Sequence, residues 1–177
     1  MLRLEGKGPH LQILSTLCAE CPHSPAGCCV APPRLDWSDV GRVVALGGRD
    51  WLLAEIAAGR LRPVERGLVI RRRKAVPREG GPKVATCAYH GPAGCTIPAD
   101  RRAATCNYYV CEDALQKGGP AEAEARVAHD ALVARFSAWD EELHAEVRAR
   151  YPEGPSWDEV FLGWLGDAYR ARAPETR

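Results

Sequence analysis

The amino-acid sequence predicts a mainly α-helical single domain with a small β-hairpin and an irregular, cysteine-rich core. Three observations lead to this fold class. The last third repeats apolar residues at helical spacing, two β-forming segments flank a Gly/Pro turn, and all eight cysteines fall in two stretches rich in Gly, Pro and Ala. A chain of 177 residues is long enough to bury a core without cross-links.

The first predicted helix lies in the segment DWSDVGRVVAL, directly after the first cysteine stretch. Asp36 or Ser38 can cap its N-terminus, and the two glycines that follow the segment can end it. Its apolar stripe consists of Trp37, Val40, Val43, Val44 and Leu46. A second short helix is expected in DWLLAEIAAG, with Asp50 as the N-cap and Gly59 just past its end.

A β-hairpin is predicted in the middle of the chain, from GLVIRRRKAV (67–76) and PKVATCAY (82–89) joined by a Gly/Pro turn. Residues 60–78 are also basic, with eight Lys and Arg against one acid, Glu65. Such clustered charge is typical of a nucleic-acid contact. Because aromatic side chains for base stacking are absent from this stretch, a charged hairpin edge that blocks strand pairing is the favoured interpretation.

The chain after residue 115 is expected to be helical. Pro120 suits a first helical position. One helix face consists of Leu132, Phe136, Trp139, Leu143 and Val147, which recur at steps of three and four. The sequence SWDE then predicts a capping box, Ser156 with Glu159, for a last helix. We therefore expect a cysteine-cluster domain over 1–115 and a C-terminal helical extension over 116–177 packed on it.

Other groups of side chains in the C-terminal part are best explained by the fold. The acidic run Asp140–Glu142 is expected to form a solvated helix face. The aromatic residues Phe136, Trp139, Phe161 and Trp164 are expected to be core. A catalytic triad, a P-loop and a glycine-rich loop for S-adenosylmethionine are absent from the sequence, so an enzyme is the least supported class.

The cysteines have a regular arrangement in two blocks. The first block has the spacing C-x2-C-x6-C-C and consists of Cys18, Cys21, Cys28 and Cys29. The second has the spacing C-x7-C-x10-C-x4-C and consists of Cys87, Cys95, Cys106 and Cys111. Such clusters have three ordinary explanations: a disulfide framework, a metal or cluster site, or a redox centre.

The expected compartment argues against disulfides. Glu5, Lys7 and Pro9 interrupt any apolar core of a signal peptide, and no stretch approaches 18 consecutive apolar residues. We therefore expect a cytoplasmic protein without a membrane partner, and structural disulfides are rare in the reducing cytosol. Thiolates are the soft ligands that zinc and iron–sulfur clusters take in fours, so a metal centre is the preferred explanation.

Neither block has the two closely spaced CxxC arms of a self-contained site, so we expect the two blocks to meet at shared metal. Neighbouring side chains in an extended segment point to opposite sides. One of Cys28 and Cys29 should therefore face the first block, and the other should face Cys87, Cys95 or Cys106. His23 and His90 follow cysteines closely and are alternative nitrogen ligands, although an exposed loop histidine is the simpler interpretation.

The order C-x2-C, then C-C, then an Asp-led helix, then a C…C…R…C run resembles the CxxCxxCC family, a YkgJ-like group described as zinc- or iron-chelating domains. The segment CTIPADRRAATC supplies Cys95, Ile97, Arg101 and Cys106, and WSDVGRVV is similar to the family's helix after the double cysteine. The resemblance spans residues 15–115, and Cys111 is extra to the common core. A related domain in flagellin lysine N-methylases is associated with an iron–sulfur cluster, which the resemblance implies here.

The sequence therefore predicts a metal-binding protein with a structural, thiolate-ligated centre. An iron–sulfur cluster, [4Fe–4S] in type, is favoured over Zn²⁺ because of the resemblance. One alternative is a zinc-based redox or nucleic-acid-binding regulator that would use the basic stretch. The other is an accessory subunit of a modifying enzyme that would bind its protein partner through the C-terminal helices. The net charge of +1 gives no chain-wide attraction to nucleic acid or membranes.

Overall fold

The computed structural model describes residues 1–18, 21, 27–78, 81–91 and 94–173, with the backbone alone at 76–78, 81 and 82. The α-helices are α1 (Trp37–Ala45), α2 (Arg49–Ala57), α3 (Thr105–Tyr108), α4 (Glu112–Gln116), α5 (Glu122–Arg150) and α6 (Glu159–Arg172). Short 3₁₀ helices lie at η1 (Gly8–His10), η2 (Thr16–Cys18), η3 (Gly27–Val30) and η4 (Gly119–Ala121). Helices make up about half of the described chain, in agreement with the predicted class.

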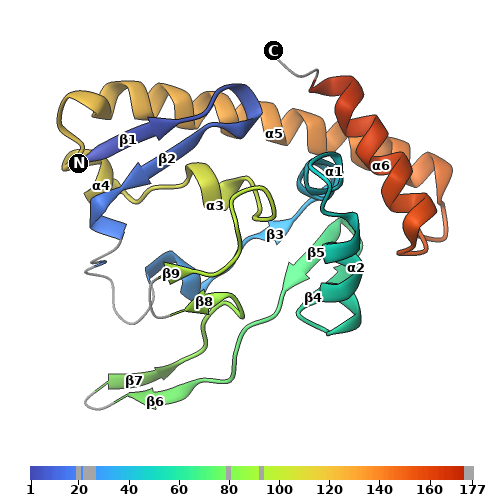
Figure 1. Cartoon of the computed structure of the whole chain (residues 1–177), viewed down its shortest axis with the longest axis horizontal. Coiled ribbons are helices and arrows are strands. Elements are labelled where there is room, and N and C mark those ends of the chain that lie inside the picture. The colour runs from blue at the N-terminus through green and yellow to red at the C-terminus, as the bar shows by residue number, and fades with distance from the viewer. Residues whose placement is uncertain (19–20, 22–26, 79–80, 92–93, 174–177) are drawn as a thin grey trace.

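The strands form small antiparallel sheets (Figure 1). They are β1 (Leu2–Glu5), β2 (Gln12–Ser15), β3 (Arg34–Leu35), β4 (Leu61–Val64), β5 (Gly67–Ile70), β6 (Val76–Arg78), β7 (Gly81–Val84), β8 (His90–Gly91) and β9 (Gly94–Cys95). In the three-stranded sheet β5 lies between β3 and β4, while β1–β2, β6–β7 and β8–β9 are two-stranded.

The 29-residue helix α5 spans the molecule and joins its two halves (Figure 1). The β1–β2 hairpin lies beside its first half, and α6 crosses its C-terminal half. Helix α1 packs against both α5 and α6. Two glycines permit the close approach of α1 and α6: a Cβ atom at Gly41 would lie 2.8 Å from Cβ of Tyr169, and one at Gly166 would lie 2.6 Å from Cγ1 of Val44.

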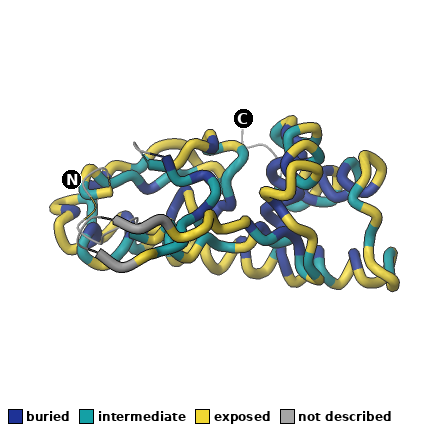
Figure 2. Tube along the Cα trace, turned by 90° about the horizontal axis from the view of Figure 1, so that it is seen from below, coloured by how far each residue is buried: buried dark blue, intermediate teal, exposed yellow. Residues whose placement is uncertain are grey.

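Two hydrophobic clusters hold these elements together. The first, called the central cluster, joins α1, the β3–β5–β4 sheet, the second half of α5 and α6, and it includes Trp37, Leu68 and Phe161. The second, called the hairpin cluster, joins the β1–β2 hairpin, α3, α4 and the first half of α5. Buried segments accordingly occur in both halves of the molecule (Figure 2). Both clusters therefore depend on the C-terminal helices.

The predicted cap and apolar stripe of the first helix, and the predicted apolar face of the long C-terminal helix, are confirmed. The Asp36 carboxylate caps α1 by accepting a 2.9 Å hydrogen bond from the Asp39 amide, and Trp37, Val40 and Val43 are almost completely buried. Helix α5 buries its predicted face at Leu132, Phe136, Leu143 and Val147, and Trp139 packs partly buried against the hairpin cluster.

Two predicted helix caps are wrong. Helix α2 begins after Gly48, so Asp50 lies inside the first turn, where a carboxylate still favours the positive end of the helix. Helix α6 begins after Asp158, which accepts a 2.9 Å hydrogen bond from the Phe161 amide. Ser156 therefore lies before the cap, because Asp158 offers an equally good acceptor nearer the apolar stripe.

The β-structure differs from the prediction in two places. Residues 2–5 and 12–15, for which no strand was predicted, pair as a hairpin whose Leu2 and Ile13 are buried. In the middle of the chain, residues 67–70 pair with β4 and β3 instead of extending the hairpin. Only the distal part of the predicted hairpin is present, as β6–β7 and an isolated bridge between Arg72 and Cys87.

The acidic run on α5 is not solvated throughout. Asp140 is only 6% exposed. Its Oδ1 accepts from the Trp37 amide at 2.8 Å and its Oδ2 from Arg66 at 2.6 Å. Glu141 and Glu142 are exposed, as expected.

In the described part of the chain, no helix has both the length and the apolar character that crossing a membrane requires.

Candidate functional site

The eight cysteines lie on short elements and at their ends. Cys18 ends η2, Cys28 and Cys29 lie in η3, and Cys95 ends β9. Cys106 lies in α3, and Cys111 is the residue before α4. None of these eight cysteines forms a disulfide. Their exposure varies, from Cys87, which is buried in the central cluster, to Cys18, Cys21, Cys28, Cys95 and Cys106, which are exposed.

The fold brings the two cysteine blocks together, as the sequence predicted. The Cys87 amide donates a 2.7 Å hydrogen bond to the carbonyl oxygen of Cys29. Cys87 is held from its other side by the basic segment, because the Arg73 amide donates to Thr86 at 2.7 Å and the Ala88 amide donates to Arg71 at 2.9 Å. The N-terminal loop is thereby attached to the base of the β6–β7 arm.

A first group of thiols surrounds Cys18. Burial, and then the nearby thiols of Cys111, Cys28 and Cys21, raise the pKa of Cys18. These sulfurs come from both blocks. Cys111 reaches this place because α3, a few residues before it, packs against β2, and β2 leads directly into η2.

A second group of thiols lies around Cys87 and Cys106. Burial, and then Asp39 and the thiols of Cys95, Cys87 and Cys28, raise the pKa of Cys106 to about 12. Burial is also the main cause of the raised pKa of Cys87; the Cys95 thiol raises it further, while the positive charge of Arg73 acts in the opposite direction.

The adjacent pair Cys28 and Cys29 joins the two groups. Interaction with the side chain of Cys29 lowers the pKa of Cys28 to about 6. The same interaction, then burial and the thiols of Cys28, Cys87 and Cys106, raise the pKa of Cys29.

This donor set suits a soft cation. Thiols that raise one another's pKa stay protonated until a positive charge arrives, and a thiophilic metal supplies that charge on binding. Among the described residues, however, no three Cys, His, Asp or Glu side chains already form a group that could hold a metal ion. The thiols are close enough to shift one another's pKa, but their sulfur atoms do not form the coordination shell of a metal ion.

Asp39 is a site residue that sequence analysis missed. It is 3% exposed, and its Oδ1 accepts a 2.5 Å hydrogen bond from the Ala104 amide, two residues before Cys106. Burial, and then the charge of Asp36, raise the pKa of Asp39 well above its usual range. The carboxyl group therefore attaches the second cysteine block to α1. In the sequence it stands in the first turn of a predicted helix, where nothing indicates a distant partner.

The histidines considered as ligands have different outcomes. His23 lies outside the described residues. The His90 backbone pairs with Cys95 in the β8–β9 ladder, and its amide donates a 3.0 Å hydrogen bond to Cys87. His90 therefore helps to bring Cys87 and Cys95 near each other through its backbone, and its role as a nitrogen ligand stays a prediction.

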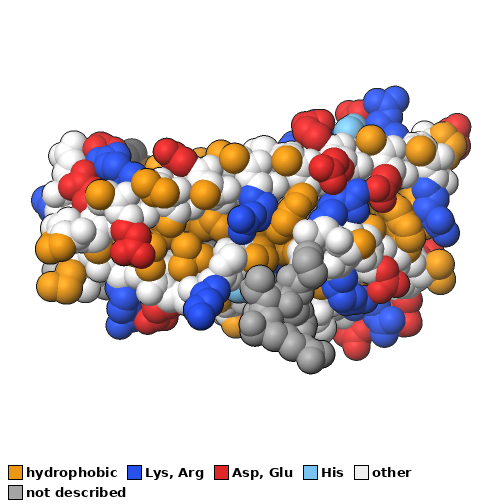
Figure 3. Space-filling view, turned by 90° about the horizontal axis from the view of Figure 1, so that it is seen from above, with side chains coloured by type: hydrophobic (Ala, Val, Ile, Leu, Met, Phe, Trp, Pro, Cys, Tyr) orange, Lys and Arg blue, Asp and Glu red, His pale blue; other side chains and the backbone are white. Residues whose placement is uncertain are grey.

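Several charges of the basic stretch are engaged within the protein. Arg60 donates to Glu55 at 2.5 Å and 2.7 Å, and Arg66 donates to Asp140 and Glu141. Arg73 donates through Nε to the Ala88 carbonyl oxygen at 3.0 Å. On the face shown in Figure 3, basic and acidic side chains are interspersed. These contacts favour a structural role for much of this stretch.

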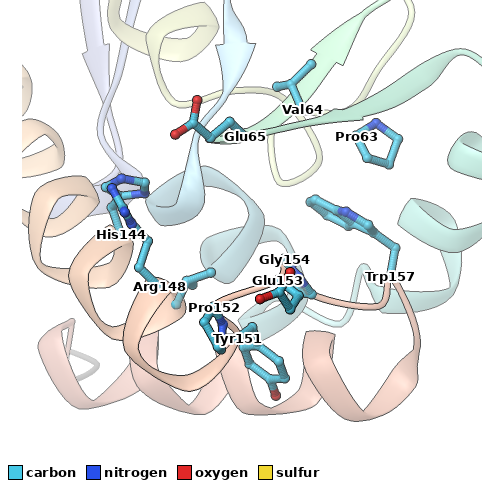
Figure 4. Close-up of a pocket in the computed structure, with 12 residues that line it drawn as sticks. Pro63, Val64, Glu65, His144, Arg148, Tyr151, Pro152, Glu153, Gly154 and Trp157 are labelled. Carbon is cyan, nitrogen blue, oxygen red and sulfur yellow. The ribbon is translucent and has the colours of Figure 1, made fainter.

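A groove with a volume of about 440 Å³ is lined by residues that include no cysteine. It is formed by the β4–β5 turn, the end of α5 and the loop before α6 (Figure 4). Its polar side chains include Glu65, His144 and Arg148. The Trp37 Nε1–H donates a 3.1 Å hydrogen bond to Nδ1 of His144, which leaves Nε2 as the proton-bearing nitrogen of the neutral ring.

Comparison with known proteins yields no relative from which a function could be inferred. No family model, curated protein or solved structure matches this chain. The resemblance of its cysteine pattern to the CxxCxxCC family therefore stays a resemblance.

Proposed function

We propose that this protein binds a thiolate-ligated metal centre, an iron–sulfur cluster in preference to zinc, which holds the cysteine-bearing loops in place. The observation that carries this proposal is the convergence of both cysteine blocks, marked by the hydrogen bond between Cys29 and Cys87. The two residues lie far apart in sequence, and no cysteine is used in a disulfide.

The chemistry of the converging side chains supports a metal rather than unliganded redox thiols. A redox pair needs two thiols, whereas here cysteines of two separate blocks approach each other. Burial and mutual repulsion make a group of unliganded thiolates unfavourable, and a bound cation removes that cost. Arg73 beside Cys87 further favours the ionised sulfur. When bound, the centre would supply cross-links between the loops.

The preference for an iron–sulfur cluster rests on the resemblance of the cysteine pattern. Both zinc and a cluster accept four thiolates, so the described residues suit either. A structural role is favoured because the site lies among short elements, η2, η3, β8, β9 and α3.

The test is to purify the intact chain without oxygen and to measure its absorption spectrum, iron, acid-labile sulfide and zinc on one sample. A broad brown charge-transfer band with matching iron and sulfide is expected. A colourless sample with stoichiometric zinc would keep the thiolate centre and reverse the choice of metal. A chain with all eight thiols open to alkylation, and no metal after reconstitution with either Zn²⁺ or Fe²⁺ and sulfide, would refute the proposal.

A further inference from the structure

We infer that the eight cysteines form two four-thiolate sites, each built from both blocks and separated at the Cys28–Cys29 peptide bond. Set one consists of Cys18, Cys21, Cys28 and Cys111. Set two consists of Cys29, Cys87, Cys95 and Cys106. Each set would hold one thiophilic centre, a zinc ion or an iron–sulfur cluster, and this inference rests on the proposed function.

Set one is gathered at the edge of the hairpin cluster. Leu17 and Cys111 both pack against this cluster, so Cys18 and Cys111 lie at the same edge. Cys21 lies against Gly27, the residue before Cys28. Gly27 has φ = +51°, and a Cβ atom there would stand only 2.7 Å from Sγ of Cys21. The absence of a side chain at Gly27 therefore makes room for the Cys21 sulfur beside Cys28.

Set two is gathered at the edge of the central cluster. Cys87 belongs to this cluster, and Cys29 packs partly buried against it. The β8–β9 ladder returns the chain to Cys95, which pairs with His90, three residues after Cys87. Cys106 follows Ala103, another buried member of the central cluster, and its amide donates to the Ala103 carbonyl oxygen at 2.9 Å. Cys29 and Cys87 thus adjoin one hydrophobic cluster, and backbone contacts tie Cys95 to His90 and Cys106 to Ala103.

The local structure at Cys28 and Cys29 explains how adjacent residues serve different sets. They lie in the 3₁₀ helix η3, where successive side chains point about 120° apart because there are three residues per turn. Cys28 is exposed, and Cys29 is half-buried against the central cluster. Because the two residues are consecutive in η3, the two sites are neighbours.

The number of thiols fits this division. Four thiolates complete the coordination of a structural zinc ion or of one iron–sulfur cluster. One such site would leave four more thiols within range of its charge and without a metal. Two sites use every cysteine, and they explain why Cys111 is present in addition to the second block's other three.

The test measures metal per chain in full-length single and double Cys→Ser variants, reconstituted anaerobically with Zn²⁺ alone and, in parallel, with Fe²⁺ and sulfide. Wild type is expected to bind two centres. The variants C28S and C111S should each lose one, and C29S and C95S should each lose the other. The same-set pair C28S/C111S should retain one centre, whereas the cross-set pair C111S/C95S should lose both.

The outcomes separate this inference from the proposed function. If wild type binds a single centre, or if C28S/C111S loses all metal while its circular dichroism matches wild type, the division is wrong and the metal-binding proposal stands. If wild type binds no metal, both fail. If a variant does not fold, the wild-type protein provides the test. As a chelator gradually removes the metal, mass spectrometry should show that the thiols become accessible to alkylation as two groups of four. Simultaneous opening of all eight would overturn the division.

Discussion

The Cys87 amide donates a 2.7 Å hydrogen bond to the carbonyl oxygen of Cys29. Backbone and hydrophobic contacts alone thus join the two cysteine blocks, since Cys87 belongs to the central cluster and Cys29 packs against it. The helices α1, α5 and α6 bury Trp37, Leu143 and Phe161 in that same cluster. The cysteine loops therefore rest on a core that does not consist of cysteines.

We expect metal removal to loosen the loops and to leave this core folded. Chelation should increase amide hydrogen exchange over η2 and η3, because these short helices bury none of their residues. The amides of α6 and of the second half of α5 should stay protected, since these helices pack against α1 and against each other. Hydrogen exchange with mass spectrometry checks this.

The matched control is the metal-loaded protein treated with the chelator already saturated by Zn²⁺. Global unfolding on chelation, seen as loss of the helical circular dichroism signal, would show that the centre stabilises the whole chain. The measured free energy would then approach the roughly 10–16 kcal/mol that structural zinc contributes in small zinc-finger peptides.

Asp140 is expected to stabilise the start of α1. Asp140→Ala leaves the buried Trp37 amide without its acceptor and removes the partner of Arg66, so a loss of about 1–3 kcal/mol is expected. Glu141→Ala is the control, because Glu141 also contacts Arg66 but is exposed, and it should cost less than about 0.5 kcal/mol. Urea unfolding measures both variants. Equal losses would contradict the role of Asp140.

The elements that the sequence predicted correctly are those whose signal is local. Asp36 stands directly before an apolar stripe, and the face from Leu132 to Val147 is long enough to establish the helical period. The β1–β2 hairpin was missed because Lys7, Gly8 and Pro9 interrupt it and its strands have only four residues each. Asp140 was misjudged because its two partners lie 103 and 74 residues away in sequence.

The candidate site was predictable in composition and only partly in arrangement. Eight cysteines in two incomplete blocks predict that the blocks meet at shared metal. The Cys29–Cys87 contact shows that the blocks approach each other, and the shared metal stays a prediction. The approach of Cys111 to Cys18 depends on how α3 packs against β2, and the role of Asp39 depends on a contact with Ala104. Such long-range packing leaves no periodic pattern in the sequence.

Glu55 should make stability depend on acid pH. Its carboxylate accepts hydrogen bonds from Arg60 and, at 2.5 Å, from the Tyr89 hydroxyl, and the Arg60 bond is the main reason that the pKa of Glu55 is lowered. The stabilisation is therefore complete above the unfolded-state pKa of about 4.3 and is lost as the pH falls through the lower folded-state pKa.

We accordingly expect Glu55→Gln to cost about 1–2 kcal/mol at pH 7, and this difference from wild type should disappear as the pH falls below 4. The exposed Glu65→Gln is the control and should change stability little at any pH. Denaturant unfolding over a series of pH values provides the measurement. A Glu55→Gln effect that is the same at every pH would mean that the charge of Glu55 is not involved.

Two glycines three residues apart on α6 should respond oppositely to alanine. At Gly163, nothing lies within 4 Å of an added Cβ atom, so Gly163→Ala gains helix propensity of up to about 1 kcal/mol, worth a rise in Tm of about 2–4 °C.

At Gly166, the added atom would lie 2.6 Å from Cγ1 and 3.2 Å from Cβ of Val44. Val44 is β-branched and buried, so it cannot rotate away, and α1 and α6 must separate. Overpacking of this kind costs about 1–3 kcal/mol, which exceeds the gain in propensity. Gly166→Ala is therefore expected to lower Tm and to leave metal content unchanged. A stabilising Gly166→Ala would mean that α1 and α6 are not in this close contact.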